Sequence, residues 1–241
     1  MEKEERIVLV IFFLYGLGGW IAWNAAITGI DFFNARFQPQ HDPGFMFGFV
    51  FTWPLFAGNI LLLYLNQKLS FVIQINVSLV MILICTGSMP FITQYLPLTS
   101  GWWLLLVSIF LNGLANSFVQ GGLFGFASIF PKKFMAMMMI SQAISGVLIT
   151  LIKIILLVSL PPGESEEKKN NLYYNSVIYI IVGGIVLVAC IIAFNFGFKL
   201  EYIQRHIEAA KTKSIPEGFE GDGISEQVSI LDKTIFGKTK F

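Results

Sequence analysis

The sequence predicts an all-α, polytopic membrane protein with six transmembrane helices. Composition is the first reason: 55% of the 241 residues are hydrophobic and 13% are charged, whereas soluble domains carry roughly a quarter charged residues. Length is the second, because six apolar stretches each reach the ~20 residues that a helix needs to cross a hydrocarbon core about 30 Å thick. A soluble helical protein is disfavoured, since helices that are apolar on every face leave no side for water.

The first predicted span covers residues 7–30 and follows a short charged segment. Its length, and the lack of a small-residue cleavage site after a short apolar core, favour a retained span over a cleaved signal peptide. The later spans are predicted at residues 44–65, 71–93, 102–129, 134–160 and 172–200, with turn-forming or charged residues between them. Residues 1–200 then form one transmembrane bundle. Residues 201–241 are charged, so we predict a cytoplasmic tail or central-loop segment there.

Basic residues predict the orientation, because loops on the cytoplasmic side of a membrane carry an excess of Lys and Arg. With the N-terminus inside, the inner links include Lys132 and Lys133, whereas the outer links hold only Arg36, Lys168 and Lys169. We therefore expect both termini in the cytoplasm. The pattern fits an integral, multi-pass protein of the plasma membrane or of an internal membrane.

The fourth span carries a row of amides. Asn112, Asn116 and Gln120 are four residues apart, so they lie on one face of a helix. An unsatisfied polar group in hydrocarbon costs several kcal/mol, so this face meets other helices or a watery cavity. Helix packing is one interpretation, because amides bond across membrane helices for ~0.6 to 2 kcal/mol. Binding a neutral polar solute is the other, since an amide both donates and accepts hydrogen bonds without charge.

The first and fifth spans carry further polar and aromatic residues. Trp20, Trp23 and Asn24 share one face of the first span, directly after a glycine-rich turn. In transporters built from three-helix repeats, glycine-interrupted spans in corresponding positions point to the binding site, and the first and fourth spans correspond. In the fifth span, Gln142 and Ser145 belong to a methionine-rich face that we interpret mainly as packing.

Charged residues within the spans are few, and none suggests catalysis. Lys153 lies inside the fifth span and either extends toward its outer end or faces a cavity. Asp31 is expected at the outer interface. No nucleophile–base arrangement, His/Cys cluster or phosphate-binding loop is visible, so the sequence predicts no enzyme, cofactor or metal site. A net charge of +1 gives no field that would attract nucleic acid.

Several motifs resemble those of the equilibrative nucleoside transporters. Residues 15–28 read YGLGGWIAWNAAIT, followed by DFF at 31–33, and this resembles the family's GLG…PWN…T…(D/Q)YF pattern in the first span. Residues 116–127 read NSFVQGGLFGFA, followed by FP at 130–131 and SQAISG at 141–146. These resemble the family pattern QG(S)LFG…LP…SGQ…G. The motifs are modest singly and specific in this order, and the similarity extends from residue 7 to about 205.

The resemblance implies a fold and a function. Members are eleven-helix facilitators related to the major facilitator fold, so this chain would correspond to the N-terminal half of such a fold. They carry nucleosides or nucleobases, in some branches with protons, and need no cofactor. By resemblance, Trp23 and Asn24 lie beside the central cavity, Gln120 matches the glutamine that contacts the nucleobase, and Asn116 lies one turn away. Residues in a supporting role would be Trp20, Asn112, Gln142 and Ser145.

The sequence also departs from the family pattern. Ala22 replaces the proline before Trp-Asn, Gly122 replaces a small hydroxyl residue, and Asn116 stands where several members have glycine. Nothing matches the acidic residue and arginine that engage the ribose from the C-terminal helices. We therefore expect a fragment of a longer carrier, or a half that pairs with a second half or in a homo-oligomer. The alternatives are a non-transporting subunit or scaffold, and an unrelated channel, which would need a pore lined by charge or carbonyls.

Overall fold

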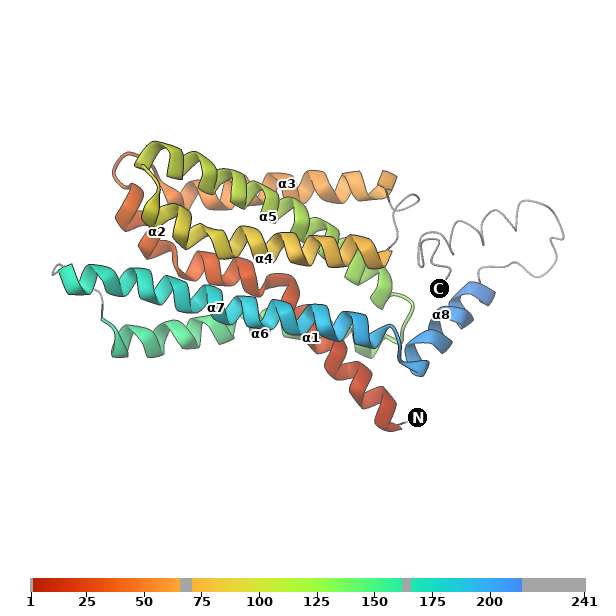
Figure 1. Cartoon of the computed structure of the whole chain (residues 1–241). Helices are drawn as coiled ribbons and strands as arrows, with labels where there is room; N and C mark the ends of the chain where they lie inside the picture. Colours follow the sequence, from red (N-terminus) through yellow and green to blue (C-terminus); the bar gives the residue numbers. More distant parts are fainter. Residues whose placement is uncertain (1, 66–70, 162–165, 214–241) are drawn as a thin grey trace.

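The computed structural model describes residues 2–65, 71–161 and 166–213, and in these residues the chain is entirely helical (Figure 1). The long helices are α1 (Glu2–Thr28), α3 (Pro43–Leu65), α4 (Phe71–Tyr95), α5 (Leu98–Ala127), α6 (Lys132–Ser159) and α7 (Glu166–Gly197). Two short helices are α2 (Ile30–Phe37) and α8 (Glu201–Lys213). In the described residues, six helices are long and apolar enough to cross a membrane, which confirms the predicted all-α, polytopic fold class. The link at 66–70 and tail residues 214–241 lie outside the described residues.

The six long helices run alternately up and down, so the molecule has two ends (Figure 1). The α8 end holds α8, the start of α1 and the α5–α6 connection. The α2 end holds α2, the α4–α5 connection and the start of α7. Successive spans therefore point in opposite directions through the bilayer, as short links between membrane helices require.

Helix packing is nearly symmetric between the first three and the last three spans. α1 packs along α6 and α7, α5 packs along α3 and α4, and the two groups meet mainly between α4 and α7. Exchanging α1 with α5, α3 with α6 and α4 with α7 reproduces this set of contacts. α1 and α5 are consequently the most buried spans, while α3 and α6 are the most exposed.

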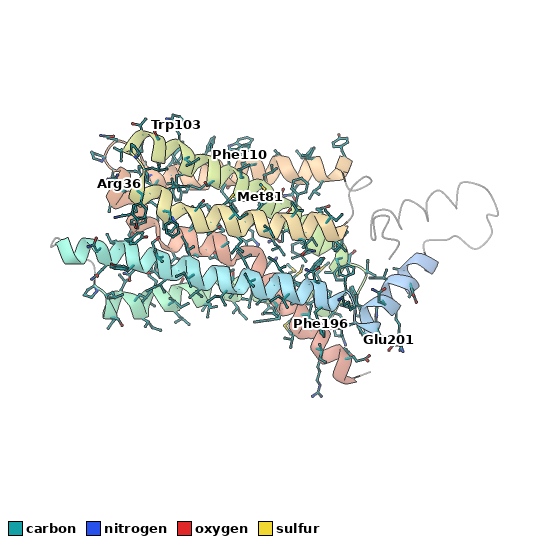
Figure 2. The ribbon with its side chains drawn as sticks, viewed as in Figure 1. Arg36, Met81, Trp103, Phe110, Phe196 and Glu201 are labelled. Carbon is teal, nitrogen blue, oxygen red and sulfur yellow. The ribbon has the colours of Figure 1, made fainter. Side chains whose placement is uncertain are left out.

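The outer surface of the bundle is apolar between polar ends. Trp103 and Phe110 on α5 and Phe196 on α7 are largely exposed, whereas Arg36 and Glu201 lie at the two ends (Figure 2). Such a surface would aggregate in water, but it matches bilayer hydrocarbon flanked by polar head groups. The chain is therefore an integral, multi-pass membrane protein.

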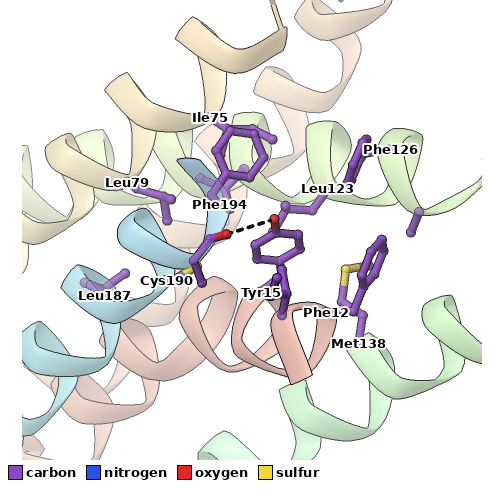
Figure 3. Close-up of a cluster of buried hydrophobic side chains, with 14 of the residues drawn as sticks. Phe12, Tyr15, Ile75, Leu79, Leu123, Phe126, Met138, Leu187, Cys190 and Phe194 are labelled. Carbon is purple, nitrogen blue, oxygen red and sulfur yellow. Dashed lines mark hydrogen bonds between the residues drawn. The ribbon is translucent and has the colours of Figure 1, made fainter. Parts of the chain in front are cut away.

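Aromatic side chains fill the bundle at the α8 end. Phe12 of α1 lies 5.1–5.7 Å, between ring centroids, from Phe126, Phe130 and Phe134. The Tyr15 hydroxyl is buried and donates a hydrogen bond of 3.5 Å to the carbonyl of Ala193 on α7 (Figure 3). The core at this end is thus built around the first half of α1.

Glycines allow α1 and α5 to approach their outer neighbours closely. A Cβ on Gly16 of α1 would lie 1.9 Å from Ser141 Oγ and 2.1 Å from the Met138 carbonyl oxygen on α6. A Cβ on Gly113 of α5 would lie 2.3 Å from the Phe51 carbonyl oxygen on α3. Both approaches reach backbone atoms, so only glycine fits. Close backbone packing of this kind holds membrane helices together without a hydrophobic driving force.

The short helices α2 and α8 cover the two ends. Arg36 of α2 donates from Nε to the Thr93 carbonyl at 3.2 Å and from Nη2 to the Leu96 carbonyl at 3.3 Å. These carbonyls are at the C-terminus of α4, where unpaired oxygens favour a cation. At the other end, Ile203 and Ile207 of α8 are buried against the aromatic core. The predicted tail therefore begins with a packed amphipathic helix, which the sequence analysis did not identify.

The glycine contact between α1 and α6 predicts opposite effects at two positions. Gly16→Ala should destabilise the bundle by about 1–3 kcal/mol, because the methyl group overpacks the helix contact. Gly125→Ala should be neutral or slightly stabilising, since its Cβ would meet no described atom within 4 Å and alanine favours a helix. Thermal unfolding in detergent measures both variants. Equal stability of the two would contradict the close α1–α6 contact.

Candidate functional site

The first contact of the candidate site joins three helices through amides. Gln142 of α6 donates from Nε2 to Oε1 of Gln120 on α5 at 2.9 Å. Gln120 in turn donates from Nε2 to the carbonyl of Gly19 on α1 at 3.5 Å. Gly19 is needed here, because a Cβ would lie 2.8 Å from Gln120 Nε2. The Gln120 amide is therefore held in one orientation by both neighbours.

The second contact lies one turn further along α1 and α6. Asn24 donates from Nδ2 to Ser145 Oγ at 2.7 Å, and Ser145 Oγ donates to the Gln142 carbonyl at 2.6 Å. Asn24 is only half-buried, and its Oδ1 accepts no hydrogen bond from the part of the chain that the structure describes. We call Gly19, Asn24, Gln120, Gln142 and Ser145 the polar seam. It offers an acceptor toward the open side of α1 and α6.

A charged contact ends the same α1–α6 interface at the α2 end. Lys153 Nζ forms an ion pair with Asp31 Oδ2 at 2.8 Å and donates to the Thr28 carbonyl at 3.1 Å. The carbonyl is at the C-terminus of α1, where a cation is favourable. Lys153 extends toward the α2 end, as one of the two interpretations of its position supposed. The two opposite charges of Lys153 and Asp31 cancel, and the pair lies between the polar seam and the α2 end.

Aromatic side chains occupy the other side of α1, facing α3. Trp23 stacks on Phe51, with ring centroids 3.7 Å apart and planes inclined by 14°. Trp20 lies 6.3 Å from the same ring. Both tryptophans are half-buried. The expectation that Trp20, Trp23 and Asn24 share one face of α1 is thus wrong in this structure: α1 presents the Asn24 amide to α6 and the two aromatic rings to α3.

The row of amides on α5 is divided between two environments. Asn112 donates from Nδ2 to Thr86 Oγ1 of α4 at 2.6 Å, which is the packing role that the sequence left open. Asn116 is fully buried, and neither of its polar atoms has a partner among the described residues. An unpaired buried amide costs about 1–3 kcal/mol, so packing alone does not explain Asn116. Gln120 alone of the three reaches the polar seam.

Two grooves lie on the α4 side of the bundle. One of about 250 Å³ is between α4 and α5, and one of about 510 Å³ is between α4 and α7. None of the eight sequence-predicted site residues lines either groove. In the described residues, no group of three His, Cys, Asp or Glu side chains comes together that could hold a metal ion. The candidate site is therefore the polar seam with its flanking tryptophans.

Sequence reasoning missed several partners of these residues. Phe51 and Thr86 belong to apolar spans, and nothing in their spacing indicates that they meet Trp23 or Asn112. The pair of Lys153 and Asp31 left a clearer signal. Two opposite charges near the same end of two spans need each other in hydrocarbon, and charge complementarity predicts their contact.

Comparison with known proteins gives one family and several relatives. The model of the nucleoside transporter family matches residues 106–238. Equilibrative nucleotide transporter 8 of Arabidopsis thaliana is 29% identical over 211 residues, which cover 84% of this chain and 52% of the relative. Equilibrative nucleotide transporter 1 of the same plant is 26% identical over 228 residues, covering 92% and 49%. The chain thus spans about half the length of these curated relatives.

The ion pair predicts an asymmetric effect of neutralising its two members. Asp31→Asn should destabilise more than Lys153→Met, because it leaves a cation inside a span without its counter-charge. Lys153→Met leaves an Asp31 side chain that is 54% exposed and can remain hydrated. Unfolding in detergent measures both variants, and the exchange Asp31→Lys with Lys153→Asp should recover part of the loss. A larger effect for Lys153→Met, or no recovery, would contradict the pairing as the source of stability.

Proposed function

Because this chain belongs to the nucleoside transporter family, we propose that it serves as one half of a facilitative carrier for nucleosides or nucleobases. The mechanism is alternating access, in which this bundle rocks against a second one around a site near the middle of the membrane. The substrate site includes Trp23, Asn24, Asn116 and Gln120. Gln142 and Ser145 support it by holding the amides of Gln120 and Asn24.

The main support for the proposal is that uncharged hydrogen-bonding groups connect α1, α5 and α6. Gln142 and Gly19 hold the Gln120 amide from two sides, at 2.9 and 3.5 Å. A substrate that displaces one of these contacts finds an oriented amide, which can both donate to and accept from the edge of a base. Orientation in advance reduces the entropy lost on binding.

The tryptophans supply the second requirement of a nucleobase. Its ring faces are apolar and stack on aromatic side chains, for about 1–3 kcal/mol per base in other proteins. Trp23 is half-buried and held parallel to Phe51, so its orientation is restrained before substrate arrives. Trp20 extends this aromatic surface along α1.

The charge of the site favours nucleosides over nucleotides as substrates. The Arabidopsis relatives are named as nucleotide transporters, and a phosphate would need a free cation. Lys153 is instead neutralised by Asp31 at 2.8 Å. The polar seam itself consists of amides, a hydroxyl and a carbonyl. An uncharged sugar–base compound therefore suits it better than a phosphorylated one.

The second bundle would cover the face formed by α1, α3, α5 and α6. α3 and α6 are the most exposed spans, and the half-buried Asn24 would otherwise meet lipid. Either a second half or another copy of the chain would meet this requirement. We also propose that both termini lie in the cytoplasm, because the links on that side carry the excess of basic residues. The competing function is a scaffold that only assembles with a partner. The hydrogen bond between Asn112 and Thr86 favours it, because it shows one amide of the row serving helix packing.

Uptake of radiolabelled adenosine and uridine into proteoliposomes that contain this chain tests the proposal. We expect saturable uptake, with affinity lowered roughly 3- to 10-fold by Gln120→Ala through loss of one hydrogen bond. Trp23→Ala should lower it roughly 10- to 100-fold through loss of stacking. Gln74→Ala is the matched control, because this amide of α4 donates to the Phe118 carbonyl and lines the groove between α4 and α5, away from the face that the second bundle would cover.

The same preparation distinguishes the scaffold. For a carrier, Gln120→Leu lowers nucleoside affinity at least as much as Gln120→Ala does, while insertion and assembly are kept. For a scaffold, Gln120→Leu impairs assembly, and the unmodified chain, assembled with its second half or a second copy, neither binds nor transports nucleosides. The second result would overturn the proposed function.

A further inference from the structure

α4 and α7 are held together at one end and leave a groove at the other. Near the α8 end, Asn76 and Asn195 exchange two amide hydrogen bonds, of 3.2 and 2.8 Å. Toward the α2 end, a groove of about 510 Å³ opens between the two helices. It lies between residues 83–91 of α4 and 177–188 of α7. None of the described residues that line it has a polar side chain.

Each of the two helices contributes a glycine to the lining of the groove. A Cβ on Gly87 of α4 would meet no described atom within 4 Å, so the space beside it is open. Gly184 lies on the facing side of α7, and Pro90 follows Gly87 by one turn. Exposed apolar side chains border the opening, including Phe91 and Ile185, which are 56% and 64% exposed. Bilayer hydrocarbon therefore has direct access to the groove.

A helix does not fill the groove. A helix is about 10 Å wide, so it would pack across the opening and leave the space beneath it. A nucleoside is excluded by chemistry, since its polar groups would find no partner among the described lining residues. The occupant must be thin, flexible and apolar.

Length and position fit a single lipid chain. The groove follows α4 for about 12 Å and α7 for about 17 Å at 1.5 Å per residue. One leaflet of a hydrocarbon core about 30 Å thick is about 15 Å deep. The groove also begins near the α2 end, where a head group would lie. A chain that descends from that interface would fill it.

Tyrosines mark the level of the head group at the mouth of the groove. Tyr95 follows Phe91 by one turn on α4, and Tyr174 precedes Val177 by nearly one turn on α7. Their side chains are 72% and 53% exposed. Exposed tyrosines at helix ends occupy the membrane interface, where the hydroxyl meets polar groups and the ring meets hydrocarbon.

We propose that the groove between α4 and α7 binds one acyl chain of a phospholipid, with the glycerol and head group beside Tyr95 and Tyr174. The chain fills the space that Gly87 leaves open beside α7. It thereby adds contacts between the α1 group of helices and the α5 group along the α4–α7 interface. This site does not depend on the proposed substrate.

Photo-crosslinking tests the site directly. The full chain is reconstituted in vesicles with a phosphatidylcholine that carries a diazirine on one acyl chain, and labelled peptides are mapped by mass spectrometry. We expect labelling of residues 83–91 and 177–188 several-fold above that of Ile192 and Phe196 on α7, which are 63% and 56% exposed outside the groove. Gly87→Phe and, from the other helix, Gly184→Phe should reduce it to the level of Ile192 and Phe196.

Gly48→Phe on α3 is the matched control, because its Cβ also meets no described atom within 4 Å while it lies far from the groove along the chain. It should leave the labelling unchanged. A parallel sample with a diazirine sterol identifies the source of the apolar group. Uniform labelling of all exposed faces, labelling that both groove variants retain, or preferential labelling by the sterol would each overturn the proposal. None of these results depends on nucleoside uptake.

Discussion

The need to satisfy polar groups inside hydrocarbon governs how this bundle is arranged. α1 carries the Asn24 amide and the Gly19 carbonyl, which Gln120 approaches because glycine has no Cβ, and Asp31 of α2 adds a carboxylate; each meets a partner on α5 or α6. In water these contacts would be worth little, since solvent would replace them. In lipid there is no substitute, so the partners fix the rotation of α6 about its axis.

Glycine contacts complement the polar ones and give the bundle its near-symmetry. Gly16 brings α1 against α6, and Gly113 brings α5 against α3, in each case with a backbone carbonyl at the point of approach. The central spans are therefore held rigidly to their outer neighbours. The interface between α4 and α7 is different, because an amide pair holds it at one end and a groove beside Gly87 remains at the other. The two groups of helices are therefore each packed more closely than they are packed against one another.

The sequence predicts the spans well because hydropathy and length act on each helix separately. Side-chain contacts between helices are not predicted in this way, since they depend on the rotation of each helix about its axis. Asn112, Asn116 and Gln120 share a face by spacing, yet one meets Thr86, one meets no described partner and one meets Gln142. The short helices escaped prediction for a related reason. α2 is fixed by Arg36 at the end of α4, and α8 by isoleucines that pack on distant aromatic rings.

The stability of the bundle does not explain why residue 116 is an asparagine. Its amide is fully buried without a described partner, although leucine would fill a helix interface at no such cost. Asn116 lies one turn from Gln120, whose amide contacts Gly19 of α1 and Gln142 of α6. α1 also carries the half-buried Trp23 and Asn24. A conformation that separates α1 from α5 would give Asn116 water or substrate as a partner and so recover the lost hydrogen bonds. An amide that is unfavourable in one conformation and satisfied in another stabilises the second relative to the first, so Asn116 would favour the separation of α1 from α5 that the proposed alternating access involves.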